Sequence, residues 1–249
     1  RLIRALLAVS QWRAVPSRLL ESLVGHAPVA VMSRRAGLAA FGAVFEHIRA
    51  GEAAGQPLAA RSLSACCRWE LITGAALLPF ASVQFAAPVA PVVLASDASP
   101  WGCGVCAADA PVGLIDEALR FAELRGEYVS LDGQRARRPA QGDRVAPYRP
   151  LAPGWEDVDW RVVFARQWPS APMVQAVGEL HSVGLAIEYA ARRVDWPGAQ
   201  QVPLLDARAA LGAVAKGCSS AWPFLRILRR VAALSFATGL QWCPRWVSS

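Results

Sequence analysis

Two short apolar runs that each end in an aspartate constrain the fold of this chain most strongly. One run occupies residues 92–97 and ends at Asp97, and the other occupies residues 201–206 and ends at Asp206. Both runs predict strands, and the almost uninterrupted apolar character of the first predicts burial on both faces. A sheet made of such strands needs helices to cover it, so the sequence favours an α/β fold.

The segments around these two runs complete a predicted mixed sheet. Residues 101–108 combine a tight turn, two glycines and β-branched character, which predicts a hairpin with the first strand. Three further elements are read from apolar patterns: a strand at 161–166, a helical stripe from Val177 to Ala191, and a closing strand at 240–247. A second helix is expected to begin after Ser219 or Ser220, with Pro223 in its first turn, and to stop at Gly239.

The chain divides into regions of different character. Residues 1–70 are predicted to be a helical connector region, in which Ser17 is a candidate helix cap. Residues 71–90 are predicted to be a linker, and residues 91–249 a domain built on the mixed sheet. Within that domain, residues 109–158 are rich in glycine and proline and predict an irregular insertion, which carries a basic cluster of Arg135, Arg137 and Arg138.

Composition narrows the class of protein and of partner. Hydrophobic residues make up 54% of the chain and charged residues 18%, which excludes a chain that is disordered throughout. The formal net charge is +7, and Lys216 is the only lysine among the 26 basic residues. Because arginine binds phosphate in a bidentate manner, this balance favours a polyanionic partner, with an arginine-rich codon bias as the alternative.

The uncharged run from Leu71 to Ala95 is long enough to cross a bilayer. Pro79, Pro88 and Pro91 interrupt it, however, and each removes a backbone donor that a spanning helix requires. We therefore expect a linker that leads into a buried strand, no membrane segment, and an intracellular protein, cytoplasmic or nuclear.

The cysteine pattern contains one candidate metal or redox motif. Cys103 and Cys106 have CxxC spacing but lie in a strand-like segment, where residues three apart point to opposite faces. The six cysteines are therefore expected to be small structural thiols in a reducing compartment.

Three carboxylates form the candidate site. Asp97 and Asp206 follow strands, and Glu179 lies near the start of the helix between them. Strand ends are where a carboxylate can leave the core and face a crevice, so the three could converge on one divalent metal site. The alternatives are a turn or cap role for each aspartate and a solvated helix position for Glu179.

At these residues the chain resembles the ribonuclease H domain of retroelement reverse transcriptases, most closely that of DIRS-type elements, which pair it with a tyrosine recombinase. The similar segments are residues 93–105 with their Asp-Ala-Ser motif, 160–168, 177–180, 204–206, 216–220, 225–230 and 245–249. The resemblance implies a ribonuclease H-like mixed sheet with flanking helices after a small helical connector. It also implies cleavage of the RNA strand of an RNA–DNA hybrid, two Mg²⁺ ions (or Mn²⁺) held by Asp97, Glu179 and Asp206, and a polymerase domain upstream.

Departures from the family pattern leave a second hypothesis open. Ala207 stands where the family usually has Asn or Ser, and Gln175-Ala176 replaces its usual Ile-Asn. The fourth carboxylate of the family follows the last strand, and we expect the chain to be truncated before it, at Ser249. The alternative function is a catalytically decayed or truncated relic that at most binds nucleic acid.

Candidate contacts to nucleic acid are arginines of the last helix. Arg226, Arg229 and Arg230 are close in sequence and are predicted to follow a phosphate backbone, with a solvated basic face as the alternative. Ser99 of the Asp-Ala-Ser motif is included among the predicted contacts. Trp242 and Trp246 are expected to pack in the core rather than to stack on bases.

Overall fold

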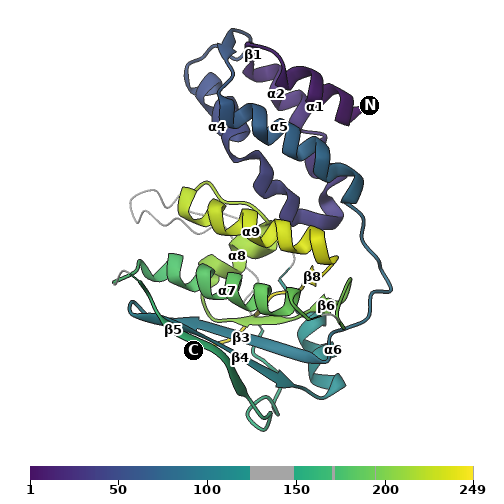
Figure 1. Ribbon diagram of the computed structural model, residues 1–249, viewed down its shortest axis with the longest axis vertical. Coiled ribbons are helices and arrows are strands. Elements are labelled where there is room, and N and C mark those ends of the chain that lie inside the picture. The colour runs from purple at the N-terminus through teal and green to yellow at the C-terminus, as the bar shows by residue number, and fades with distance from the viewer. Residues whose placement is uncertain (124–148, 170–171, 194, 249) are drawn as a thin grey trace.

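The structure is a computed structural model that describes residues 1–123, 149–169, 172–193 and 195–248 (Figure 1). The elements before the main sheet are α1 (Leu2–Ser10), β1 (Ala14–Pro16), α2 (Ser17–Val24), α3 (Ala27–Ala30), η1 (Met32–Phe41), α4 (Gly42–Ala53), β2 (Ala60–Ser62), α5 (Ala65–Leu77) and η2 (Leu78–Phe80). Those that follow are β3 (Val92–Ala98), β4 (Gly102–Asp109), α6 (Val112–Arg120), β5 (Arg161–Gln167), α7 (Gln175–Ala191), β6 (Gln200–Gln201), β7 (Pro203–Leu205), α8 (Arg208–Lys216), α9 (Trp222–Thr238), β8 (Gln241–Trp242) and β9 (Arg245–Trp246).

A five-stranded mixed sheet forms the centre of the molecule. Its strand order is β5-β4-β3-β7-β9. The pairs β3–β4 and β4–β5 are antiparallel, whereas β3–β7 and β7–β9 are parallel. This arrangement confirms the prediction of an α/β fold with a mixed sheet, and it confirms the hairpin after the first apolar run.

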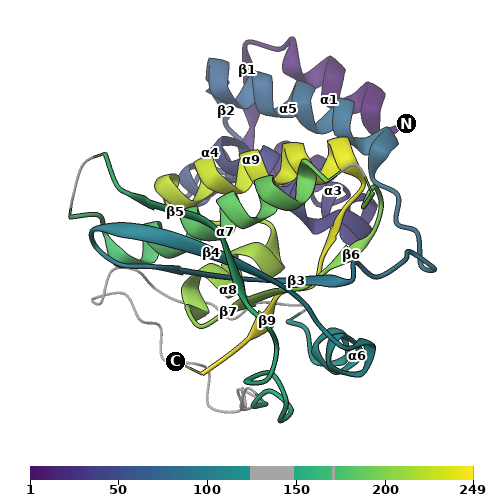
Figure 2. The same cartoon turned by 60° about the horizontal axis from the view of Figure 1, so that its bottom comes forward.

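Helices cover both faces of the sheet (Figures 1 and 2). On one face, α7 crosses the strands and α9 packs against α7, with Leu180, Ile187 and Leu228 fully buried between them. On the other face, α6 contributes Ile115 and Ala118 to a smaller core with Val93 of β3. The sheet is therefore a middle layer, as expected for strands whose residues are apolar on both sides.

The N-terminal helices have their own core and pack against α9. Leu6, Phe41 and Leu71 are among the fully buried residues of that core. The guanidinium of Arg34 reaches the end of α9 and donates to the carbonyl oxygens of Ser235 (3.0 Å), Gly239 (2.8 Å) and Leu240 (3.1 Å). Arg34 thus satisfies carbonyl groups that the end of a helix leaves without partners.

Several boundaries differ from the sequence prediction. The segment 71–90 is not a linker throughout, because α5 continues to Leu77 and η2 follows it. The predicted irregular insertion at 109–158 contains the regular helix α6, and its residues 124–148, with Arg135, Arg137 and Arg138, lie outside the described residues. Ser17 begins α2 but does not cap it, since its hydroxyl donates to the carbonyl oxygen of His47.

In the C-terminal half, the structure has one helix more than the sequence predicts, and one predicted strand is divided into two. Helix α8 lies between β7 and α9 and was not predicted; it ends at Gly217, whose φ of +71° suits a residue without a side chain. Helix α9 begins after Ala221 without a side-chain cap, so neither Ser219 nor Ser220 caps it as predicted, and it ends at Gly239 as predicted. The expected closing strand is divided into β8 and β9.

The uncharged segment from Leu71 to Ala95 does not form one long helix. It is divided among the end of α5, η2, a connecting segment and β3. Across the residues that the structure describes, none of the helices has both the length and the apolar character needed to cross a membrane.

Candidate metal centre

The pairing of β3 with β7 brings the two aspartates to the same edge of the sheet. Ala95 of β3 lies opposite Leu204 of β7, and the two strands are parallel. Asp97 and Asp206 each follow their paired residue by two positions, so both carboxylates leave the sheet at the same level and on the same side. Helix α7 begins beside this edge and contributes Glu179 from its second turn.

The three predicted carboxylates meet. One oxygen atom each from Asp97, Glu179 and Asp206 lies within 4.8 Å of the other two. Glu179 is buried, Asp206 is half-buried and Asp97 is exposed, so the cluster runs from the core to the surface. This group of side chains could hold a metal ion, as the sequence predicts.

The electrostatic environment of Glu179 is unfavourable for a charged side chain. Burial, and next the neighbouring carboxylate of Asp97, raise the pKa of Glu179 from 4.5 to about 7, and Asp206 acts in the same direction. Hydrogen bonds from Gln175 and the backbone of Ala98 oppose this shift of the pKa. Near neutral pH the protonated and charged forms of Glu179 therefore coexist, and a bound cation would favour the charged form.

Gln175 holds the buried glutamate in place. Its Nε2 donates to Oε1 of Glu179 (2.5 Å) and to the carbonyl oxygen of Ala98 (2.6 Å). This amide therefore ties α7 to the end of β3, next to Asp97. Sequence reasoning noted Gln175 only as a departure from the family pattern. The signal that could have identified it is its spacing of four from Glu179, which places both side chains on one face of a helix.

The side chain of Ser99 forms hydrogen bonds with the backbone of the turn after β3. Its Oγ accepts hydrogen bonds from the backbone amides of Trp101 (3.2 Å) and Gly102 (3.1 Å) and lies 3.3 Å from the carbonyl oxygen of Gly102. Ser99 is exposed at the tip of the hairpin, close in sequence to Asp97. The observed role of its hydroxyl is to stabilise the β3–β4 turn.

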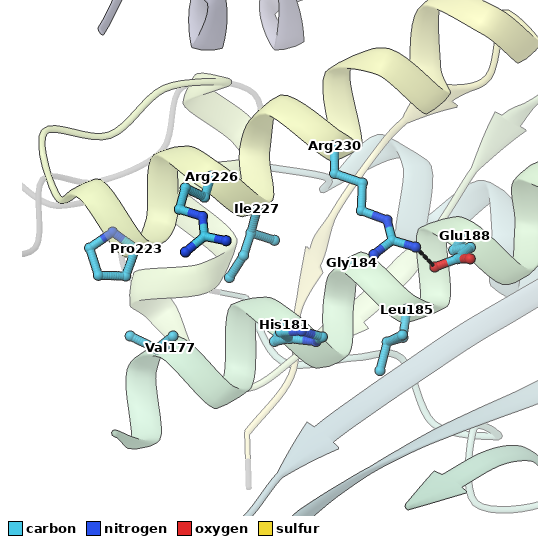
Figure 3. Close-up of a pocket in the computed structure, with 9 residues that line it drawn as sticks. All are labelled: Val177, His181, Gly184, Leu185, Glu188, Pro223, Arg226, Ile227 and Arg230. Atoms are coloured by element: carbon cyan, nitrogen blue, oxygen red, sulfur yellow. Dashed lines mark hydrogen bonds and ion pairs between the residues drawn. The ribbon is translucent and has the colours of Figure 1, made fainter. Parts of the chain in front are cut away.

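The three predicted arginines face two different surfaces of α9. Arg229 faces the N-terminal helices, where it forms an ion pair with the buried Glu70 and donates to the carbonyl oxygen of Ala39 (3.2 Å). These contacts of Arg229 join α9 to α5 and η1. Arg226 and Arg230 line a groove between α7 and α9 (Figure 3).

The remaining aromatic and sulfur predictions concern packing. Trp242 and Trp246 pack against the core beneath α9, and the indole nitrogen of Trp242 donates to Ser235 Oγ (2.5 Å). Both contacts agree with the expected core role. All six cysteines are free, and no cysteine belongs to the candidate metal cluster found among the described residues.

Comparison of the chain with family models, with curated proteins and with solved structures gives no match. The geometry of the carboxylate cluster and the motifs of the sequence therefore carry the functional argument.

Proposed function

We propose that this chain is a metal-dependent nuclease domain of the ribonuclease H type, which hydrolyses the RNA strand of an RNA–DNA hybrid. The observation that carries the proposal is the convergence of Asp97, Glu179 and Asp206, with one oxygen of each within 4.8 Å of the others. Two strand ends, a helix start and a family resemblance point to these same three residues.

The donor set suits Mg²⁺ or Mn²⁺. Carboxylate oxygens are the ligands that these hard cations prefer, and the exposure of Asp97 leaves one side of the cluster open to water and to a substrate phosphate. The raised pKa of Glu179 is a second sign of fit, because burial and then the neighbouring carboxylates of Asp97 and Asp206 disfavour its charged form, which a bound cation would favour. A divalent cation supplies the missing positive charge.

When bound, two divalent ions supply an activated water and a counter-charge for the leaving oxygen of the phosphodiester. The chain contributes the positions of the ligands. Asp97 and Asp206 are fixed by the paired strands β3 and β7, and Glu179 is fixed by the hydrogen bond from Gln175. Because these supports are backbone pairing and a side-chain amide that is bonded at both of its ends, the carboxylates are held in place before the substrate arrives.

Two further features support a nucleic-acid substrate. The mixed sheet with helices on both faces is the architecture that the family resemblance implies. The formal charge of +7 favours association with a polyanion, and the acidic cluster lies at one sheet edge within this basic chain.

The test is hydrolysis of an RNA–DNA hybrid with a labelled RNA strand, in the presence of Mg²⁺ or of EDTA. Asp97→Asn is expected to reduce cleavage at least a thousandfold, or about 4 kcal/mol in transition-state stabilisation. Asp109→Asn is the matched control, because Asp109 is an exposed aspartate at the far end of the same hairpin. Cleavage that survives Asp97→Asn would refute the assignment.

The second candidate is a domain that binds nucleic acid without turnover. Ala207 favours it, because this residue supplies no side-chain hydrogen bond where the resemblance expects Asn or Ser beside the third acid. This candidate predicts steeply salt-dependent binding of the hybrid with no cleavage in Mg²⁺ or Mn²⁺. Metal-dependent cleavage that Asp97→Asn removes would refute it.

A further inference from the structure

We propose that the groove between α7 and α9 is a binding site for an organic phosphate of nucleotide type, separate from the carboxylate cluster. The groove has a volume of about 350 Å³ (Figure 3). Sites for small ligands typically span about 300–1,000 Å³, and the groove lies near the lower end of this range, which suits one nucleotide unit. Side chains of α7, among them His181 and Glu188, line one side of the groove, and side chains of α9, among them Arg226 and Arg230, line the other.

The groove and the carboxylate cluster use opposite faces of α7. An α-helix turns by about 100° per residue, so Val177, His181 and Glu188 fall on one face. Glu179 falls about 160–200° away from each of them and faces the sheet edge. The groove therefore does not belong to the metal centre, and its ligand need not be the strand that is cleaved.

The rim of the groove carries the charge that would recognise a phosphate. Arg226 and Arg230 are four residues apart on α9, and Figure 3 shows both side chains directed toward α7. Arg230 pairs with Glu188 (2.6 Å), but Glu188 also pairs with Arg192 (2.6 Å), so a single carboxylate serves two guanidinium groups. Arg226 is exposed and makes none of the ion pairs observed among the described residues. The rim thus has an uncompensated positive charge, which suits bidentate binding of phosphate.

The floor and walls of the groove are apolar and suit the sugar or base of a nucleotide. Val177, Leu185 and Ile227 contribute aliphatic surface. Gly184 keeps the floor open, because a methyl group there would lie 3.2 Å from Ile227 Cγ2. His181 adds a polar ring, which packs edge-on against Trp168 with 5.3 Å between ring centroids, and its buried Nδ1 has no protein partner among the described residues. An apolar pocket with a few polar groups and a cationic rim is typical of an organic phosphate site.

The experiment follows the histidine ring resonances by NMR, in EDTA, so that metal binding plays no part. The chain has three histidines, and His26, just before α3, and His47, in α4, lie in the N-terminal region and serve as internal controls. Adenosine monophosphate is the probe, with adenosine and inorganic phosphate as partial probes. We expect a saturable shift of the His181 signal alone, with weaker binding of both partial probes.

Arg226→Ala is expected to weaken adenosine monophosphate binding at least tenfold, because it removes a charge-assisted contact. Arg49→Ala is the matched control, since it removes the same charge from an exposed position on α4 and is expected to have little effect. A short oligoadenylate identifies the source of the phosphate: tighter binding than adenosine monophosphate indicates a strand, and weaker binding indicates a free nucleotide.

Three results would overturn the proposal. The first is a His181 signal that does not move with adenosine monophosphate or with oligoadenylate. The second is an equal loss of affinity in Arg226→Ala and Arg49→Ala, which would indicate attraction by net charge alone. The third is binding of inorganic phosphate as tight as that of adenosine monophosphate, which would exclude a role for the apolar walls.

Discussion

Replacing Glu179 with glutamine is expected to stabilise the metal-free protein at pH 8 but not at pH 4.5. The folded state holds the pKa of Glu179 at about 7, mainly through burial, whereas the ordinary value is 4.5. Between these values the folded chain keeps a proton that the unfolded chain has lost, so stability falls as the pH rises and levels off above about 7. Each pKa unit corresponds to about 1.4 kcal/mol, which gives an upper value of about 3 kcal/mol for ionising Glu179.

The Glu179→Gln substitution keeps the shape of the side chain, and the new amide oxygen could still accept the hydrogen bond from Gln175. Thermal unfolding in EDTA measures the effect, and 1–3 kcal/mol corresponds to a rise in Tm of about 2–12 °C at pH 8 for a chain of this size. Glu188→Gln is the control on the same helix, and we expect it not to stabilise, because Glu188 is paired with Arg192 and Arg230. A Glu179→Gln variant no more stable than the wild type at pH 8 would refute the reasoning.

Three further substitutions test other parts of the structure. Arg229→Ala should cost about 2–4 kcal/mol in urea unfolding, because it leaves the buried Glu70 without its cationic partner, and an unchanged midpoint would contradict this. Gln175→Ala should weaken Mn²⁺ binding about tenfold or more by releasing Glu179, with little change in the far-ultraviolet circular dichroism. Ser99→Ala should cost about 1 kcal/mol of stability through the lost turn contacts while leaving hybrid binding unchanged, and a loss of binding without a loss of stability would contradict this and support the predicted contact with nucleic acid.

The strands that end near Asp97 and Asp206, and the helix that carries Glu179, could be predicted because each has a clear pattern of apolar residues in the sequence. The apolar runs before Asp97 and Asp206 specify strands buried on both faces, and parallel pairing then sets both acids at one level. The start of α7 follows from its apolar stripe, which brings Glu179 to the same edge. The apolar runs and the start of the helix are local in the sequence, whereas the pairing of β3 with β7 joins distant residues, and the family resemblance singled out the three acids together.

The features that the sequence did not predict are the contacts of Arg229 and the helices α6 and α8. Arg229 and Arg230 are adjacent in sequence, but about 100° of rotation separates them, and α5 supplies Glu70 only once the N-terminal helices have packed. Helix α8 has only nine residues, with Leu211 and Val214 as its large apolar side chains, and the glycine that ends it, Gly217, was the signal available in the sequence. Helix α6 has a short stripe, centred on Ile115 and Ala118, within a segment rich in glycine and proline.

The measurement that tests the central claim most directly is Mn²⁺ binding, followed by the loss of the free-ion electron paramagnetic resonance signal at pH 8. Wild-type protein is expected to bind Mn²⁺ saturably, and Mg²⁺ is expected to compete for the same site. Asp97→Asn and Asp206→Asn should each weaken binding at least tenfold, whereas the control Asp109→Asn should not. Equal Mn²⁺ affinity in the wild type and in Asp97→Asn would contradict the claim that Asp97, Glu179 and Asp206 form a metal centre.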